Sequence, residues 1–276
     1  MDEPHDTQTY YTPTQLVYVA DGDLRLLIYK YTLTQMTAKA GIRKHGKAAE
    51  AALMTEFAQL EDLSVYEPVA PASLTKQQRK AALRAINLIK AKRDGRLKGR
   101  TVADGRAQMK SETSSPTVAT DALMLSIVVD AHEGRDVATA DVAGAYLKAN
   151  MDDFVLLKFT GESVDILCKM NKKYAKYVTK EGNVKVLYAR LAKALYGCVK
   201  SAMLWYQLFT ESLQQMGFVL NPYDPCIANC MIEGSQCTVA WYVDDNKISH
   251  ANPDVVTAII EKIEEKFNKM TVIHGR

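Results

Sequence analysis

The 276-residue sequence has few cysteines, no long apolar run and little net charge. Its five cysteines form no Cys-x-x-Cys pair, and Cys226 and Cys230 are far from any histidine, which argues against zinc and predicts buried, reduced thiols in an intracellular protein. The longest uncharged, mostly apolar stretch, 122–129, is far too short to span a bilayer. No basic start leads into an apolar core and a cleavage site, so we expect no signal peptide, no secretion and no membrane partner.

Charge is distributed unevenly along the chain. The net charge of +3 does not by itself predict a polyanionic partner. However, eleven Lys and Arg fall between Lys76 and Arg106, against two Asp, and such a local excess is typical of contact with nucleic acid or phosphate. A solvated basic helix face is the alternative. With 47% hydrophobic and 24% charged residues, the composition suits one large globular domain or a domain with an appendage.

The first half of the chain contains few regular patterns. Residues 1–46 are polar without a sustained period and are expected to be a linker or irregular N-terminal extension. An Ala-, Glu- and Leu-rich stretch predicts a helix over 47–63. Thr75 and Gln78 fit a capping box that begins a basic helix with Leu83, Ile86 and Ile89 on one face. Residues 97–103 are expected to form a strand of an Arg- and Lys-bearing hairpin.

The second half mixes strands and helices without strict alternation. Pro116 is expected in the first turn of a buried helix over 119–131. The patterns predict further strands at 136–142, 154–159 and 184–188, helices at 164–177, 199–216 and 253–269, and a hairpin of 226–232 with 237–243. The absence of a regular β-α-β order favours an α+β fold with an antiparallel sheet and packed helices.

The most informative segment is Tyr242-Val243-Asp244-Asp245. An apolar run precedes it and a short β-prone run follows, which predicts a tight hairpin with two carboxylates at its tip. Carboxylates held on a rigid turn can bind Mg²⁺ while substrate phosphates complete its coordination. The alternative is an ordinary solvated acidic turn.

Asp141 is the second acidic position. It ends an apolar strand, as Asp244 does, so the two side chains could lie side by side at one end of a sheet. Three carboxylates there would suit two Mg²⁺ ions, with Mn²⁺ as a substitute, about 4 Å apart, clamping the attacking and leaving oxygens of an in-line phosphoryl transfer. The alternative for Asp141 is a helix N-cap after a strand.

Five segments in order resemble one protein family, the reverse transcriptases of copia-type LTR retrotransposons. Asp141 to Tyr146 resembles the first acidic motif of reverse transcriptases, and Tyr242 to Asp245 resembles their Tyr-x-Asp-Asp box. The segments that complete the resemblance are 98–105, 194–206 and 217–226. The sequence departs from many family members at Lys200-Ser201-Ala202-Met203, where they carry Gln-Ala-Pro-Arg.

The resemblance implies a right-hand polymerase fold. Residues 47–120 would form a fingers-like region, and 121–276 a palm-like catalytic region that is incomplete at its C-terminus. Family members continue into a primer-gripping hairpin, a thumb and ribonuclease H, so the thumb is expected to be absent and the chain to be part of a Pol polyprotein. The implied activity is RNA-directed DNA synthesis, and the alternative is a catalytically inactive nucleic-acid-binding remnant.

The resemblance also implies roles for individual residues. Asp141, Asp244 and Asp245 would be the catalytic, metal-holding acids. The residues expected to contact the nucleotide are Val142, Tyr146, Lys98, Arg100 and Gly197, with Tyr146 under the sugar and Gly197 allowing a close backbone approach. Lys92, Arg93, Arg96 and Tyr242 would contact nucleic acid. Tyr146 as a core aromatic is the alternative for that position, and Trp205 and Tyr206 are expected to pack in the core.

The partners implied are an RNA or DNA template with its primer, deoxynucleoside triphosphates and other parts of the polyprotein. The expected location is the cytoplasm, in virus-like particles, or the nucleus.

Overall fold

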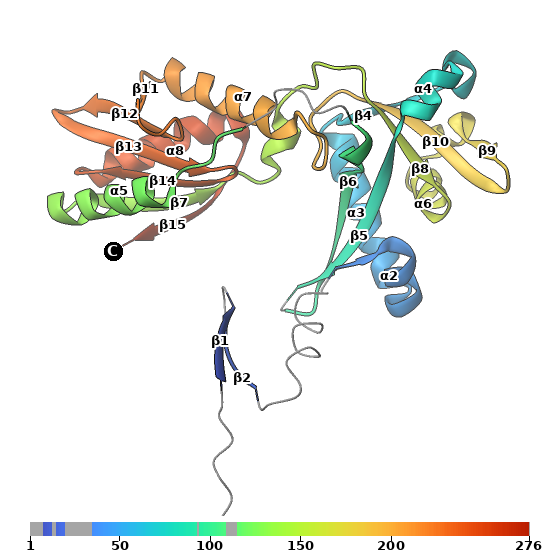
Figure 1. Cartoon of the computed structure of the whole chain (residues 1–276), viewed down its shortest axis with the longest axis horizontal. Coiled ribbons are helices and arrows are strands. Elements are labelled where there is room, and N and C mark those ends of the chain that lie inside the picture. The colour runs from blue at the N-terminus through green and yellow to red at the C-terminus, as the bar shows by residue number, and fades with distance from the viewer. Residues whose placement is uncertain (1–7, 13–14, 20–34, 93, 109–114, 276) are drawn as a thin grey trace, which may run out of the picture.

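The computed structural model describes residues 8–12, 15–19, 35–92, 94–108 and 115–275 (Figure 1). They form two large β-sheets with helices packed against them, together with an antiparallel hairpin of β1 (Gln8–Thr12) and β2 (Gln15–Val19). No helix in this described part is long and apolar enough to cross a membrane. The expectation of mixed sheets and helices is confirmed.

The first large sheet has seven strands. Its main path runs β3-β5-β8-β10-β4, with β6 paired to β5 and β9 paired to β10. The strands are β3 (Gln35–Thr37), β4 (Tyr66–Val69), β5 (Leu83–Ala91), β6 (Leu97–Ala103), β8 (Leu156–Thr160), β9 (Thr179–Glu181) and β10 (Val184–Leu191). All pairs are antiparallel except β5 with β8. These strands come from both sides of the boundary expected at residue 120.

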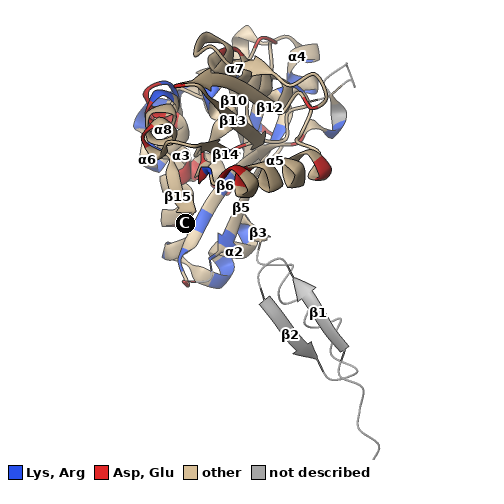
Figure 2. Cartoon of the chain, turned by 90° about the vertical axis from the view of Figure 1, so that its left-hand side faces the viewer, with Lys and Arg blue, Asp and Glu red and all other residues tan. Residues whose placement is uncertain are grey.

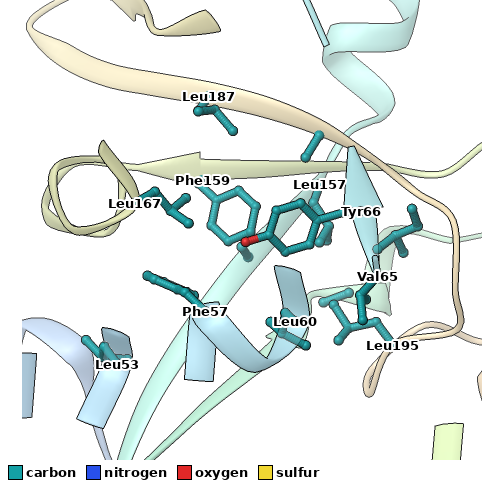
Figure 3. Packing of buried hydrophobic residues seen from close by; sticks show 14 of the residues in the cluster. Leu53, Phe57, Leu60, Val65, Tyr66, Leu157, Phe159, Leu167, Leu187 and Leu195 are labelled. Atoms are coloured by element: carbon teal, nitrogen blue, oxygen red, sulfur yellow. The ribbon is translucent and has the colours of Figure 1, made fainter. Parts of the chain in front are cut away.

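Helices cover the seven-stranded sheet. They are α2 (Ala38–His45), α3 (Lys47–Asp62), α4 (Lys76–Ala81), α6 (Glu162–Met170) and the 3-10 helix η4 (Lys172–Tyr177), while the short 3-10 helices η1 (Pro71–Ser73) and η2 (Gly105–Ala107) lie in connections after β4 and β6. Phe57 of α3 packs edge-on against Phe159 of β8, with ring centroids 5.9 Å apart (Figure 3). Each fully buried Leu or Phe in this core contributes roughly 1.5–3 kcal/mol. The core therefore holds α3 firmly beside β6.

The second sheet has six strands, all antiparallel, in the order β11-β12-β13-β14-β7-β15. The strands are β7 (Asp136–Asp141), β11 (Val219–Leu220), β12 (Ile227–Ile232), β13 (Ser235–Tyr242), β14 (Asp245–His250) and β15 (Thr271–Gly275). The hairpin predicted for 226–243 is confirmed as β12–β13. The sheet agrees with the expected antiparallel arrangement.

One face of the six-stranded sheet is covered by α7 (Ser201–Gln215) and α8 (Pro253–Phe267). Ala138 and Ala140 of β7 join this core, whereas Thr139 and Asp141 line a groove on the opposite face, because neighbouring side chains of a strand point to opposite sides. Trp205 is almost fully buried, so its predicted core role is confirmed. Asp141 therefore lies on the face that α7 and α8 do not cover.

The opposite face carries α5 (Thr120–Glu133), which differs from its prediction. The helix begins four residues after Pro116, so Pro116 is not in its first turn. Nor is it a buried helix: Met124, Leu125, Ile127 and Val128 are 44–64% exposed. Instead, the Lys247 ammonium of β14 bonds the buried Asp130 carboxylate and attaches α5 to the sheet. Apolar composition predicted burial, but the helix has protein on one side only.

The basic segment after the capping box is also different from its prediction. The box is present, since Thr75 and Gln78 bond each other's backbone N–H, but α4 ends at Ala81. Residues 83–91 form β5 instead, with Leu83, Ala85, Asn87 and Ile89 buried in alternation. The three-residue spacing of Leu83, Ile86 and Ile89 indicated a helix, whereas pairing with β3, β6 and β8 favours the strand.

Two smaller differences concern helix boundaries. The helix predicted over 164–177 is divided at Asn171 into α6 and η4. Within residues 1–46, β3 and α2 are regular, with the Thr37 side chain accepting a hydrogen bond at the N-cap of α2. The helices predicted over 47–63, 199–216 and 253–269 are confirmed as α3, α7 and α8 within a few residues.

Candidate functional site

The acidic turn joins β13 to β14. Tyr242 pairs with Asp245, leaving Val243 and Asp244 as the two turn residues. Val243 has φ of +58°, at the position where a type II′ turn requires positive φ. Because Val is β-branched, this conformation is strained by roughly 1–3 kcal/mol and needs support from its surroundings. The Trp205 indole N–H provides it by donating to the Val243 carbonyl at 2.7 Å.

The second acidic motif lies directly beside this turn. Asp141, the last residue of β7, is the register partner of Asp245 in β14. The Val142 N–H donates to the Asp244 carbonyl at 2.9 Å, which connects the two motifs beyond the end of the ladder. Asp141 is not a helix N-cap, because Gly144 takes that position before the 3-10 helix η3 (Ala145–Lys148). The structure thus brings Asp141, Asp244 and Asp245 to one end of the sheet.

The three carboxylates influence one another. Burial, and then the neighbouring charge of Asp244, raise the pKa of the Asp141 carboxyl above its ordinary value. Burial raises the pKa of Asp245 as well, with Asp244 and Asp141 adding to the effect. Like charges at close range disfavour ionisation, so this end of the sheet carries negative charge that a cation would stabilise.

A pocket of about 180 Å³ connects these acids with the seven-stranded sheet. Asp141 and Asp244 line it together with Lys98 and Arg100 of β6. These four residues come from three motifs, in which Arg100, Asp141 and Asp244 are successively more than forty positions apart in the sequence, and the fold brings them to one cavity. Lys and Arg residues recur along the β5–β6 hairpin, where they are blue in Figure 2.

Two tyrosines form a wall of the site. Tyr146 of η3 and Tyr196 have ring centroids 4.5 Å apart, and Arg100 lies over the Tyr196 ring at 5.8 Å. Burial, followed by the charge of Asp244, raises the pKa of Tyr196 to about 12, so its hydroxyl stays protonated. Tyr146 is half-buried and also packs against the core of the six-stranded sheet. Tyr196 was not predicted, although it directly precedes the glycine singled out in 194–206.

Gly197 is explained by a crossing of two chain segments. Its φ is +90°, and a Cβ there would lie 2.0 Å from the Ala103 carbonyl oxygen. The Ala103 N–H donates to the Tyr196 carbonyl at 2.7 Å, and a Cβ at Gly105 would lie 2.0 Å from the Gly197 carbonyl oxygen. Protein backbone therefore lies against Gly197, and this crossing by itself requires a residue without Cβ. Its contact with a nucleotide stays a prediction.

Other predicted residues lie outside the pocket. Lys92 and Arg96 are at the exposed tip of the β5–β6 hairpin, where Arg96 pairs with Asp94 at 2.6 Å. Arg93 is outside the described residues. Val142 is fully buried, so only its backbone faces the acids. Tyr242 is 56% exposed and lines, with Asp141 and Asp245, a separate groove of about 410 Å³ beneath α5.

The chemistry of the acids fits Mg²⁺. Within the described ranges, no three His, Cys, Asp or Glu side chains lie close enough to enclose an ion by themselves. Mg²⁺ is usually held by one or two carboxylates, with substrate phosphates and water completing an octahedron. Asp141, Asp244 and Asp245 offer only oxygen donors, and the neighbouring carboxylate charges that help to raise the pKa of Asp141 and Asp245 would be compensated by such an ion.

The comparisons with known proteins agree with this geometry. Residues 72–274 match the family "Reverse transcriptase (RNA-dependent DNA polymerase)". The chain is 27% identical over 201 residues to the transposon Ty1-DR4 Gag-Pol polyprotein of Saccharomyces cerevisiae, a match covering 71% of this chain and 11% of that protein. The TyH3 Gag-Pol polyprotein is also 27% identical, with 71% and 10% covered.

The chain thus spans about a tenth of the length of these polyproteins. Its family match covers most of the described residues, including both acidic motifs and β6. These matches confirm the resemblance to copia-type elements that was inferred from the sequence motifs. The chain belongs to the reverse transcriptase (RNA-dependent DNA polymerase) family.

Proposed function

We propose that this chain is the RNA-directed DNA polymerase core of a copia-type retrotransposon, extending a primer 3′-hydroxyl by two-metal nucleotidyl transfer. One observation carries the proposal: Asp141 and Asp244 share a cavity with Lys98 and Arg100. Such a site combines acids for metal ions with cations for a triphosphate, the two requirements of phosphoryl transfer. The family match supports the same reaction.

In this proposal the two large sheets correspond to the parts of a right hand. The six-stranded sheet is the palm, because its β7 and β13–β14 turn carry the acids. The seven-stranded sheet is the fingers, because β6 brings the cations to the pocket. The fingers then include 156–191 as well as residues before 120, since β8 and β10 belong to the same sheet as β5.

Asp141 and Asp244 would hold Mg²⁺, with Asp245 beside them. When bound, the metal would supply activation of the primer hydroxyl and neutralisation of the triphosphate. Lys98 and Arg100 bind the triphosphate oxygens through charge-assisted hydrogen bonds. Tyr146 lies under the sugar and excludes a 2′-hydroxyl, supported from behind by Tyr196.

The partners are a primed RNA or DNA template and deoxynucleoside triphosphates. Lys92 and Arg96, at the tip of the β5–β6 hairpin, extend the cationic surface toward the template backbone. Tyr242, exposed beside the acids, lies where the primer end would be. The rest of a Gag-Pol polyprotein is a further partner, since the yeast relatives are named as Gag-Pol polyproteins.

The test is primer extension on an RNA template with a DNA primer in Mg²⁺. Asp244→Asn keeps the size of the side chain and removes its charge, so we expect extension to fall by at least about a hundredfold while the fold is retained. Asp254→Asn, an exposed acid in the first turn of α8, is the matched control and should extend normally.

Extension retained by Asp244→Asn would overturn the assignment of the acids. A folded chain that binds the primed template in a salt-sensitive manner, yet extends no primer, would instead favour a non-catalytic nucleic-acid-binding role, because salt competes with phosphate contacts.

A further inference from the structure

Glu56 is an acid in the pocket that no sequence motif indicated. It lies on α3, and its side chain lines the same 180 Å³ cavity as Asp141, Asp244, Lys98 and Arg100. One carboxylate oxygen accepts a hydrogen bond from the Thr101 N–H at 2.9 Å. That N–H is on the edge of β6 that β5 does not occupy. Glu56 therefore reaches the strand that carries both cations.

The approach of α3 to β6 is unusually close. A Cβ at Gly99 would lie 2.5 Å from the Ala52 carbonyl oxygen and 3.0 Å from the Glu56 Cβ. Lys98 and Arg100 flank this glycine on either side, so both cations are tied to the turn of α3 that carries Glu56. The position of Glu56 relative to the two cations is thus set by backbone contact and by a hydrogen bond.

The charges in the pocket are incompletely paired. Three carboxylates, of Glu56, Asp141 and Asp244, face two cations. Among the described residues, no acid lies within ion-pair distance of Lys98 or Arg100. Glu56 nevertheless attracts both, since their charges lower its pKa while burial, the larger effect, raises it. Lys98 and Arg100 therefore interact with the Glu56 carboxylate electrostatically, at distances longer than a salt bridge.

We infer that Glu56 is a positioning residue for nucleotide binding. Its carboxylate is the counter-ion of Lys98 and Arg100 in the empty pocket, and the two cations exchange it for the phosphate oxygens when a triphosphate binds. The inference rests on the proposed function. A carboxylate beside two cations keeps them in the pocket when it is empty and competes with the triphosphate when it is filled. Its charge therefore weakens triphosphate and pyrophosphate binding and speeds the release of the product.

Two variants separate this role from a structural one. Glu56→Gln retains an oxygen to accept from the Thr101 N–H but has no charge, whereas Glu56→Ala removes both. Glu61→Gln is the matched control on the same helix, because Glu61 contacts Asn171, Lys173 and Tyr174 rather than the pocket.

The experiment is a calorimetric titration of the full chain with Mg²⁺-dTTP and, separately, with Mg²⁺-pyrophosphate. We expect the dissociation constant of Glu56→Gln to fall about three- to tenfold, the size expected of one charge acting over several ångströms in a hydrated pocket. Glu56→Ala should show a similar gain in affinity together with a lower Tm, and Glu61→Gln should show no gain.

The outcomes distinguish this inference from the proposed function. Unchanged or weaker binding by Glu56→Gln, beside clear binding by the unaltered chain, would overturn the inference alone. A lower Tm in Glu56→Ala as the sole effect would show that Glu56 only satisfies the Thr101 N–H, and would also overturn it. No nucleotide binding by the folded, unaltered chain would overturn the inference, and absence of primer extension as well would overturn both proposals.

Discussion

The Trp205 indole N–H donates a hydrogen bond to the carbonyl oxygen of Val243 at 2.7 Å. Trp205 is fixed in the core of the six-stranded sheet, stacked on Phe209 with ring centroids 5.3 Å apart. Val243 is the strained residue of the acidic turn and directly precedes Asp244. A core side chain of α7 thus holds the backbone conformation that positions a proposed catalytic acid.

Trp205→Phe should therefore impair catalysis more than stability. A smaller aromatic ring remains, but the Val243 carbonyl loses its donor and the core loses part of the indole packing, so we expect about 2–3 kcal/mol less free energy of unfolding. A small displacement of Asp244 should lower kcat by roughly tenfold or more. Urea unfolding and primer extension measure the two effects.

Trp241→Phe is the matched control for that change. Its indole N–H is buried and has no hydrogen-bond partner within the described chain, so the substitution removes packed ring atoms but no hydrogen bond, and it should cost about 1–2 kcal/mol of stability while leaving activity unchanged. Equal activity losses in the two variants would contradict a specific role for the Trp205 hydrogen bond.

Gly197→Ala should disrupt the crossing of β6 with the segment before α7. A methyl group would meet the Ala103 carbonyl oxygen, which is backbone and cannot turn away, so we expect a loss of about 3 kcal/mol or more. Gly182→Ala separates the contribution of backbone strain, because Gly182 also has positive φ but nothing within 4 Å of its missing Cβ. That variant should lose only about 1 kcal/mol. Similar losses in urea unfolding would show that the crossing is not tightly packed.

Asp245→Asn should stabilise the protein when no divalent ion is present. Burial, together with the charges of Asp244 and Asp141, disfavours the ionised Asp245 carboxylate, and the amide relieves that repulsion. We therefore expect a higher Tm than that of the unaltered chain in EDTA. Adding Mg²⁺ should raise the Tm of the unaltered chain more, since a bound ion compensates the charge. A lower Tm of the variant in EDTA would show that the carboxylates do not repel one another.

Glu56 should make stability depend on pH. Because burial raises its pKa in the folded state above the ordinary value of 4.5, the folded protein binds this proton more tightly than the unfolded chain. The contribution of Glu56 to the free energy of unfolding is most favourable at pH below its ordinary pKa, and it declines as the pH rises through the raised pKa of the folded state. Glu56→Gln cannot titrate, so its advantage in free energy of unfolding over the unaltered chain should grow with pH and then level off. Urea unfolding between about pH 4.5 and pH 7.5 tests this, and a constant difference would contradict it.

Several elements were predictable because their signals are local. The capping box of Thr75 and Gln78, the Asn252–Pro253 start of α8 and the acidic turn depend on a few neighbouring residues, and each is present. The adjacency of Asp141 to the turn was also expected, since both motifs end strands. The family resemblance indicated Lys98 and Arg100 of β6 as nucleotide contacts, but it did not show how these side chains come to lie beside the acids.

The errors occurred where contacts are distant in sequence. The 83–91 segment has apolar spacings that suit both a helix and a strand, and its pairing partners, 35–37, 97–103 and 156–160, decided between them. The apolar helix α5 was expected to be buried, yet its surroundings leave most of it exposed. Glu56 belongs to the pocket only through packing, and its sequence neighbourhood contains no functional signal, whereas Tyr196 could have been found from its place beside Gly197 in the 194–206 segment.

By itself, the sequence determined the family, the acidic turn and the helices with clear caps, because motifs and capping act over a few residues. Only the tertiary structure decided that β8 and β10 join the sheet of β5, that α3 presents Glu56 to Lys98 and Arg100, and that Gly197 is required by a backbone crossing. These features depend on strand pairing and close packing between segments up to about a hundred residues apart, which no local pattern encodes.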